Sequence, residues 1–365
     1  MPLHLMMTAD AVGGVWTYAL DLARGVAAGG GETTLVVLGP PATDDQRRDA
    51  RGVQGLALIE AGHALDWTAQ GPADIEAAAQ AIATLVRSFR PDILHLNSPA
   101  LAPVGGLPIP VLGACHSCLA TWWRAVRDGS PPSDFAWRIA ALRRGMAACD
   151  ALVAPTRSFA RATAEAHGVA APAVVLNGRR AAAPGPKTAR ERLVFTSGRL
   201  WDEGKNFAVL DAAAALAGVP LHAAGPLDGP GGERVRPRHA RALGRVTCEG
   251  IAEHLRAAPI YASAALYEPF GLGVLEAAQA GCALVLSDIP TLKELWDGAA
   301  VFADPCRPAA FAAAFRDLFA DEAALDAMGR RAEARAQRFT VEAMADDMLD
   351  LYRRLGAAPR REAAA

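Results

Sequence analysis

The segment ALYEPFGLGVLEAAQAG, residues 265–281, has the pattern of a turn that leads from a sheet edge into a buried helix. An apolar run at 260–263 precedes it and predicts a strand. Pro269 and Gly271 suit the residues just before a helix, and Gly281 suits its C-terminal cap. Strand, turn and helix in this order are typical of a doubly wound α/β sheet, which binds ligands at the carboxyl ends of its strands.

Two acids interrupt this otherwise apolar segment. Glu268 and Glu276 bracket seven residues that carry no other charge. A carboxylate on a helix that is apolar nearly all round needs a hydrogen-bonding or charged partner. The free N–H groups near Phe270, Gly271 and Leu272, at the start of the helix, would attract a diphosphate or sugar oxygens. Spacing alone leaves an alternative, in which Glu268 is a surface acid and Glu276 a buried ion-pair member.

The whole chain of 365 residues alternates apolar strands with helical segments in two successive regions. Several of the strands are continuously apolar, as buried parallel strands are. Between the regions lies a stretch rich in proline, glycine and charge, which we interpret as a linker. We therefore predict an α/β fold of two Rossmann-like doubly wound domains. The predicted parts are an N-terminal domain over 1–178, a linker over 179–192, a C-terminal domain over 193–338, and a closing helix and tail over 339–365.

Composition narrows the class of protein. Hydrophobic residues make up 52% of the chain, which excludes a disordered protein, and a formal net charge of −2 argues against a nucleic-acid partner. Six cysteines in a chain of this length do not make a disulfide framework. The N-terminus has no basic leader, and no run of about 18 apolar residues occurs. We expect a cytoplasmic protein without a transmembrane helix.

Two cations follow the first predicted strand of the second region. Arg199 and Lys205 lie in TSGRLWDEGKN, residues 196–206, where an arginine fork and a lysine point charge would suit an anionic ligand. Lysine occurs at only three positions in the chain, which makes Lys205 more informative than an ordinary loop charge. Solvated loop charges are the alternative interpretation.

The first region offers a weaker glycine-rich loop. Gly13 and Gly14, in DAVGGVWTY (10–18), follow the first predicted strand and open a helix. This is where a ligand loop belongs, but the spacing is not the GxGxxG of dinucleotide-binding proteins. A plain strand–helix turn is the alternative.

The segment ACHSC, residues 114–118, follows another predicted strand of the first region. Cys115 and Cys118 are better interpreted as core cysteines than as a zinc pair, because a zinc site needs a second pair of ligands that the sequence does not offer. His116 lies at the strand end and faces the expected ligand cleft; a purely structural histidine is the alternative.

Together these motifs resemble the retaining family-4 glycosyltransferases of the GT-B fold. The resemblance covers nearly the whole chain, and the pair of glutamates with FGL between them is its most specific part. It implies an enzyme, a hexosyltransferase, whose two domains face a central cleft. The segments that carry it in the second region are GRLWDEGKN (198–206), HAAGP (222–226), EPFGLGVLE (268–276) and SDIPTLKEL (287–295).

The resemblance also implies roles for residues of the second region. Arg199 and Lys205 match the pair that neutralises the donor diphosphate. Glu276 matches the acid that accepts hydrogen bonds from the ribose hydroxyls, and Glu268 matches the acid beside the donor sugar. The backbone at 270–272, formed by Phe270, Gly271 and Leu272, matches the groups that hold sugar or phosphate oxygens.

In the first region the match is less specific. Gly13 and Gly14 match a loop that approaches the phosphates, and His116 matches a histidine near the transferred sugar. The chain departs from the family at LNGRR (176–180), where Arg179 and Arg180 follow a turn that an acid usually follows. This departure bears on local linker contacts and not on the chemistry.

The expected reaction moves a sugar from a nucleotide-diphosphate-sugar donor to an unidentified acceptor, which is a saccharide, a lipid or a small molecule. No cofactor is implied, and no DxD-type acid pair stands out to hold a metal, so we expect metal-independent transfer. The alternatives are a non-catalytic nucleotide-sugar binding protein and another GT-B enzyme such as a sugar-nucleotide epimerase. Tryptophans and arginines over 121–145 allow a peripheral membrane contact, but an ordinary helical core stripe is the favoured interpretation.

Overall fold

Two compact units make up the computed structural model, which describes residues 2–183 and 190–357. The first, unit 1, consists of residues 2–124, 128–178 and 341–357. The second, unit 2, contains 125–127 and the described residues from 179 to 340. Of the predicted linker, 184–189 lie outside the described residues, and so does the predicted tail beyond Ala357.

Unit 1 is built on a parallel sheet in the order β3-β2-β1-β4-β5-β6-β7. From the inner strand β1 the chain moves outward to β3 and then returns to the other side of β1 through β4, which pairs with it at Leu5 and Ile93. The crossover connections place helices on both faces of the sheet, and this explains why β1 and β4 are largely buried. The strands are β1 (His4–Asp10), β2 (Glu32–Leu38), β3 (Leu56–Glu60), β4 (Ile93–Leu96), β5 (Val111–Ala114), β6 (Ala151–Ala154) and β7 (Ala173–Val174).

The helices of unit 1 begin with recognisable local signals. Thr43 forms a capping box with Gln46 at the start of α2, and Pro72 occupies the first position of α3. Gly168 ends α6 in the left-handed conformation that favours glycine. The helices are α1 (Gly14–Ala28), α2 (Asp44–Arg51), α3 (Pro72–Phe89), α4 (Leu119–Val126), α5 (Ser133–Ala148), α6 (Arg157–His167) and α13 (Val341–Ala357), with a short 3₁₀ turn η1 (Pro99–Leu101).

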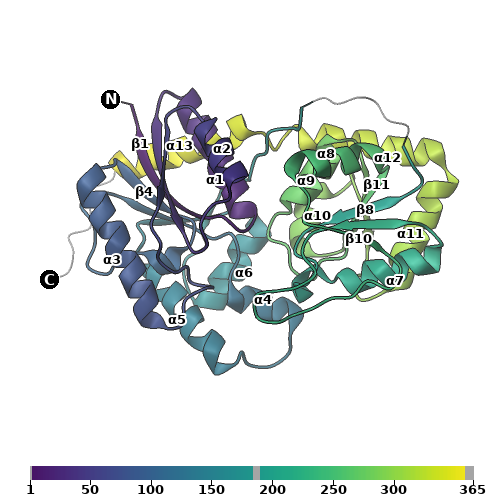
Figure 1. Cartoon of the computed structure of the whole chain (residues 1–365), viewed down its shortest axis with the longest axis horizontal. Helices are drawn as coiled ribbons and strands as arrows, with labels where there is room; N and C mark the ends of the chain where they lie inside the picture. The colour runs from purple at the N-terminus through teal and green to yellow at the C-terminus, as the bar shows by residue number, and fades with distance from the viewer. Residues whose placement is uncertain (1, 184–189, 358–365) are drawn as a thin grey trace. The chain divides into compact units, whose positions relative to one another are not determined.

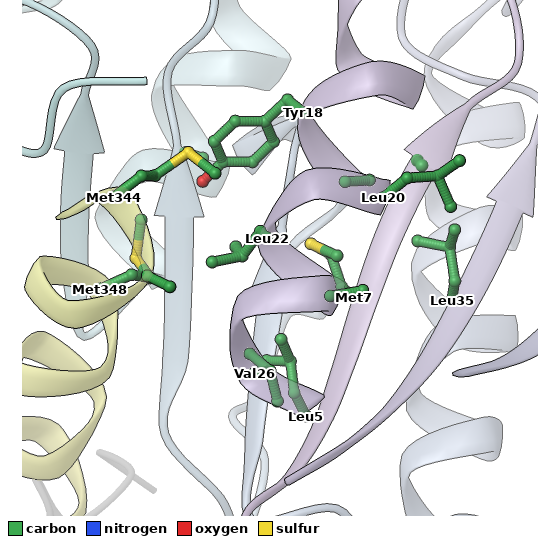
Figure 2. Packing of buried hydrophobic residues seen from close by; sticks show 14 of the residues in the cluster. Leu5, Met7, Tyr18, Leu20, Leu22, Val26, Leu35, Met344 and Met348 are labelled. Carbon is green, nitrogen blue, oxygen red and sulfur yellow. The ribbon is translucent and has the colours of Figure 1, made fainter. Parts of the chain in front are cut away.

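The last described helix, α13, belongs to unit 1 and packs against α1 (Figure 1). Met344 and Met348 point from α13 towards the cluster that contains Tyr18 and Leu22 of α1 (Figure 2). The two helices approach so closely that a Cβ added at Gly25 would lie 2.2 Å from the Cβ of Ala345. The C-terminal segment therefore completes the core of the unit that the N-terminal segment begins.

Unit 2 repeats the architecture with a parallel sheet in the order β10-β9-β8-β11-β12-β13. Its core is formed by alanine, leucine, valine and phenylalanine side chains from the strands and from α7 and α11. The strands are β8 (Val194–Ser197), β9 (Leu221–Ala224), β10 (Arg241–Gly244), β11 (Ile260–Ser263), β12 (Ala283–Ser287) and β13 (Val301–Ala303). The helices are η2 (Glu203–Lys205), α7 (Phe207–Ala217), α8 (Cys248–Ala257), α9 (Leu272–Gln279), α10 (Pro290–Trp296), α11 (Pro308–Ala320) and α12 (Glu322–Ala336).

Both sheets confirm the predicted fold class of two doubly wound α/β units. The tryptophan-rich stretch contributes to the ordinary helix α5, whose Leu142 and Met146 are buried and whose Trp137 donates a hydrogen bond to Asp134. In the described part of the chain, none of the helices combines the length and the apolar character that a membrane span requires.

Candidate active site

The carboxyl end of β8 lies beside the loop that follows β9. Gly198, with a φ of 146°, directly follows β8, and a Cβ added at Gly225 would lie 1.7 Å from the Gly198 carbonyl oxygen. A side chain at Gly225 is therefore excluded unless the backbone moves. This close approach positions the start of the loop that carries Arg199 and Lys205.

Lys205 and Glu268, predicted on separate motifs, form an ion pair in the structure. Lys205 Nζ lies 2.5 Å from Glu268 Oε2, and the two side chains are 25% and 14% exposed. The backbone holds the two loops together, because the N–H groups of Leu266 and Tyr267 donate to the Gly204 carbonyl. Glu268 is thus not a surface acid, and this part of the spacing-based alternative is wrong.

Arg199 pairs locally and keeps its charge at the surface. Its Nη2 lies 3.0 Å from Oδ2 of Asp202, and its side chain is 50% exposed. Asp202 also accepts a hydrogen bond from the N–H of Gly204, which fixes the turn η2 that leads to Lys205. Both predicted cations therefore lie in one short loop at the sheet edge, each beside an acid of the protein.

Glu276 pairs with an arginine that the sequence analysis did not assign to the site. Arg179 Nε lies 2.8 Å from Glu276 Oε1, and the two side chains are 18% and 28% exposed. Glu276 is therefore an ion-pair member, as the spacing-based alternative held, but it is only partly buried. The one signal for this partner in the sequence was the departure at Arg179 itself.

The first turn of α9 leaves backbone donors available. Gly271 precedes the helix with a φ of 90°, a conformation that glycine adopts without strain. Among the described residues, no backbone hydrogen bond outside the regular elements uses the N–H groups of Phe270, Gly271 or Leu272. The ring of Phe270 is buried against Phe339, so this residue offers its backbone and not its side chain. The helix N-terminus is thus suited to an anion.

Tyr261 is a further polar group at this edge that the sequence analysis missed. Its hydroxyl lies 3.3 Å from Ser197 Oγ and touches the space above Gly273, where an added Cβ would lie 2.9 Å away. Burial raises the pKa of Tyr261, and the nearby charges of Glu268 and Glu276 raise it further. The hydroxyl therefore stays protonated, and it donates a hydrogen bond to the Ser197 carbonyl at 3.4 Å.

The glycine loop of unit 1 is partly occupied by its own chain. Oδ1 of Asp10, at the end of β1, accepts hydrogen bonds from the N–H groups of Val12 and Gly13, at 2.8 and 3.2 Å. Gly14 begins α1, whose first residues have no side-chain cap. A ligand at this loop would therefore use the donors from Gly14 onward, and the predicted role of Gly13 would require Asp10 to release its N–H group.

His116 lies in a polar network across the ends of β1, β4 and β5. Asn97 Nδ2 donates to the Thr8 carbonyl at 2.6 Å, so Asn97 Oδ1 is the acceptor for Nε2 of His116 at 2.7 Å and of His95 at 3.1 Å. Both imidazoles therefore carry their proton on Nε2. Nδ1 of His95 then accepts from the Tyr352 hydroxyl of α13 at 2.5 Å. The network sets the tautomer of His116 and leaves its Nδ1 as an acceptor.

Burial keeps both histidines neutral. Desolvation lowers the pKa of His116 to about 4, and it lowers the pKa of His95 to about 3 with a further contribution from the charge of His116. The unfolded chain, with an ordinary histidine pKa of 6.5, therefore binds more protons than the folded one below pH 6.5. The stability that the neutral histidines contribute is present above pH 6.5 and is lost as the pH falls.

The lowered pKa of His116 predicts a pH dependence of stability that can be measured. Between pH 6.5 and 4.5 we expect His116→Gln to lose roughly 2 kcal/mol less stability than the wild type, at roughly 1.4 kcal/mol per pH unit. Urea unfolding at several pH values measures the difference. His239→Gln, which changes an exposed histidine, should keep the wild-type profile. Parallel profiles for His116→Gln and the wild type would show that folding leaves the pKa of His116 unchanged, which would contradict the expectation.

The two cysteines beside His116 are core residues, as expected. Cys115 and Cys118 are buried free thiols. Cys118 Sγ lies 3.0 Å from Thr121 Oγ1 and 3.3 Å from His167 Nε2. Within residues 2–183 and 190–357, no group of three potential metal ligands comes together.

Two family models match the chain and together account for most of it. The model of Glycosyltransferase Family 4 matches residues 12–180, and the model of Glycosyl transferases group 1 matches residues 191–321. The chain is a family-4, group 1 glycosyltransferase. It is therefore an enzyme that transfers sugars, as the resemblance predicted.

Individual relatives of this glycosyltransferase agree with that assignment. A glycogen synthase of Mycobacterium tuberculosis (strain CDC 1551 / Oshkosh) is 28% identical over 379 residues, which cover 90% of this chain and 87% of that protein. A D-inositol 3-phosphate glycosyltransferase of Kineococcus radiotolerans is 37% identical over 114 residues, which cover 28% of this chain and 26% of that protein.

Solved structures share the fold at low sequence identity. Sucrose-phosphate synthase from Thermosynechococcus elongatus superimposes with a TM-score of 0.76 at 18% identity, over 98% of this chain and all of that one. Anabaena HepE in complex with UDP-glucose gives a TM-score of 0.72 at 17% identity, over 97% of this chain and 100% of that one. The glycosyltransferase has the predicted GT-B fold class.

Proposed function

We propose that this glycosyltransferase moves a sugar from a nucleotide-diphosphate-sugar donor to an acceptor, with retention of anomeric configuration and without a metal ion. The observation that carries the proposal is the arrangement at one sheet edge of unit 2. There the paired Lys205 and Glu268 lie in loops joined by backbone hydrogen bonds, and Glu268 lies just before the free N–H groups of α9. Cations and helix donors suit a diphosphate, and carboxylates suit sugar hydroxyls.

The donor class is supported by the fold relative HepE, which was solved with UDP and with UDP-glucose. In this chain, Glu276 would accept hydrogen bonds from the ribose, and Glu268 would accept them from the transferred sugar. Each carboxylate contacts its cation through one oxygen, Glu276 through Oε1 and Glu268 through Oε2. A carboxylate has about four lone-pair positions, so both acids retain acceptor capacity for a ligand.

The chemical step would draw on the same groups. As the bond between sugar and diphosphate breaks, the departing diphosphate gains negative charge. Lys205 and Arg199, with the N–H groups of α9, would stabilise that charge, and preorganised electrostatic stabilisation of this kind commonly contributes more to catalysis than any other single effect. A leaving-group oxygen would accept the proton of the acceptor hydroxyl on the same face of the sugar, which retains the configuration. No side chain is assigned as a covalent nucleophile.

Metal independence gives a direct test. We expect exhaustive treatment with EDTA to change turnover by no more than about twofold, measured with the sugar nucleotide that stabilises the protein. The reason is that Lys205 and Arg199 supply the positive charge that a metal would otherwise supply. Added Mg²⁺ or Mn²⁺ should not raise turnover. A loss of turnover with EDTA that Mn²⁺ reverses would overturn this part of the proposal.

Proton NMR of the product tests the stereochemistry in the same reaction. The anomeric coupling constant of the newly formed glycoside should match the configuration of the donor. An inverted product would contradict retention, and consumption of the donor to an isomeric sugar nucleotide without an acceptor would identify an epimerase instead.

A further inference from the structure

Arg179 is held in place by unit 2 through its backbone as well as its side chain. Its N–H donates to the Phe339 carbonyl at 3.1 Å, and its carbonyl accepts from Gln279 Nε2 at 2.8 Å. Gln279 and Glu276 are three residues apart on α9 and so lie on neighbouring positions of one face. Arg179 therefore contacts this helix twice, once through its carbonyl and once through its guanidinium.

Phe339, whose carbonyl accepts the hydrogen bond from the Arg179 backbone, packs beside the start of α9. The ring of Phe339 packs edge-on against Phe270 at 5.8 Å, and it also contacts Trp296 at 5.4 Å. Phe270 is one of the residues whose free N–H groups open α9. The backbone of Arg179 is therefore bonded to a residue of the same buried aromatic cluster that contains Phe270.

The ion pair leaves half of the carboxylate unused. Arg179 contacts Glu276 through one N–H group, Nε, and one oxygen, Oε1. In the described part of the chain no hydrogen bond involves Glu276 Oε2. Both side chains are partly buried, so the attraction is screened less than in a fully exposed pair. The pair therefore restrains the rotamer of Glu276 while one oxygen stays available to a ligand.

The residue type at position 179 decides which charge Glu276 faces. A guanidinium stays charged at every working pH, so Glu276 always faces a cation here. An acid at residue 179, the kind of residue that the family resemblance leads one to expect near this turn, would face Glu276 with a like charge. The arginine is thus a feature of this chain with a direct consequence for one acid of the proposed site.

We propose that Arg179 is a positioning residue that holds Glu276 in the rotamer that presents Oε2 to the ribose hydroxyls of the nucleotide. This inference rests on the proposed function, because it assigns the ribose to Glu276. A restrained carboxylate loses less conformational freedom when the ligand binds than a mobile one does. Loss of Arg179 should therefore weaken recognition of the ribose and leave recognition of the diphosphate unchanged.

The experiment compares two ligands on four proteins by isothermal titration calorimetry. The ligands are the nucleoside diphosphate that stabilises the wild type most and its 2′,3′-dideoxy counterpart, which lacks the ribose hydroxyls. The proteins are the wild type, Arg179→Ala, Arg179→Lys and Arg180→Ala. Arg180 is the adjacent exposed arginine, so its variant removes the same charge one residue away.

The wild type should prefer the ribonucleotide, and Arg179→Ala should reduce that preference by roughly tenfold with little change for the dideoxy ligand. Arg179→Lys should recover part of the preference, and Arg180→Ala should keep all of it. An unchanged preference in Arg179→Ala would overturn the inference, as would tighter ribonucleotide binding, which would show that Arg179 competes with the ribose. If the wild type binds no nucleoside diphosphate at all, the proposed function fails and this inference fails with it.

Discussion

Replacing Lys205 with alanine is expected to slow turnover of the sugar nucleotide by roughly 10²–10³-fold, the usual cost of losing one preorganised charge-stabilising donor. Lys205 supplies a full positive charge from a side chain that is only 25% exposed, and Glu268 holds it 2.5 Å away in a defined position. The diphosphate gains charge in the transition state, so the effect should fall mainly on kcat. Release of nucleoside diphosphate in a coupled assay measures it.

Lys293→Ala is the matched control for this prediction. Lys293 also lies in unit 2 and pairs with an acid, Asp288 at 2.9 Å, but it has no role in the proposed site. Its removal should leave kcat within about twofold of the wild type, because an exposed pair contributes little. Equal kcat values for Lys205→Ala and the wild type would remove Lys205 from the mechanism.

The loss of Lys205 also leaves Glu268 without its cation, which is expected to lower stability as well as activity. Lys205→Met keeps most of the side-chain volume and separates packing from charge. If both variants melt near the wild-type temperature and both lose turnover, the missing charge explains the loss. A variant that regains activity when stabilised at lower temperature would indicate a folding defect instead.

Most of the sheet could be predicted from the sequence because buried parallel strands are continuously apolar. The strands β1 and β12 show this pattern at 5–7 and 283–286. Several elements gave no such signal, and two of them illustrate the reasons. The helix α2 (Asp44–Arg51) buries only Ala50 and has no apolar stripe, and the edge strand β10 (Arg241–Gly244) is largely exposed. Their formation depends on a capping box and on pairing with β9, which spacing does not reveal.

The candidate site, too, could be predicted only in part from the sequence. Motif spacing located Glu268 and Glu276 at the carboxyl edge of a sheet, because both belong to one strand–turn–helix segment. Their partners lie far away in the chain, at Lys205 and Arg179, and no local periodicity connects residues so distant. The tautomer of His116 likewise depends on Asn97, which reaches it from a neighbouring strand end. Long-range pairing of this kind became visible only with the fold.

Glu276→Ala is expected to abolish most nucleotide binding while leaving the sheet intact. Hydrogen bonds to a charged group contribute about 1.5–3 kcal/mol each, so losing the ribose contacts should weaken binding roughly 100-fold. The variant also leaves Arg179 without its acid, which should lower the melting temperature of the unliganded protein. Glu276→Gln, which keeps the shape and removes the charge, separates this effect from the loss of the side chain. Binding is therefore judged from the rise in melting temperature that the ligand produces in each protein, not from the absolute melting temperature of that protein.

The measurement that tests the central claim most directly is a thermal-shift panel with UDP, GDP, ADP, TDP and CMP, each in excess and without metal, on the wild type and Glu276→Ala. A ligand at about 100 times its dissociation constant adds roughly 2.7 kcal/mol of stability, which is a shift of a few degrees for a protein of this size. We predict that at least one nucleoside diphosphate raises the melting temperature of the wild type and fails to raise that of Glu276→Ala. A wild type that responds to none of the diphosphates, or a variant that responds as strongly as the wild type, would contradict this prediction.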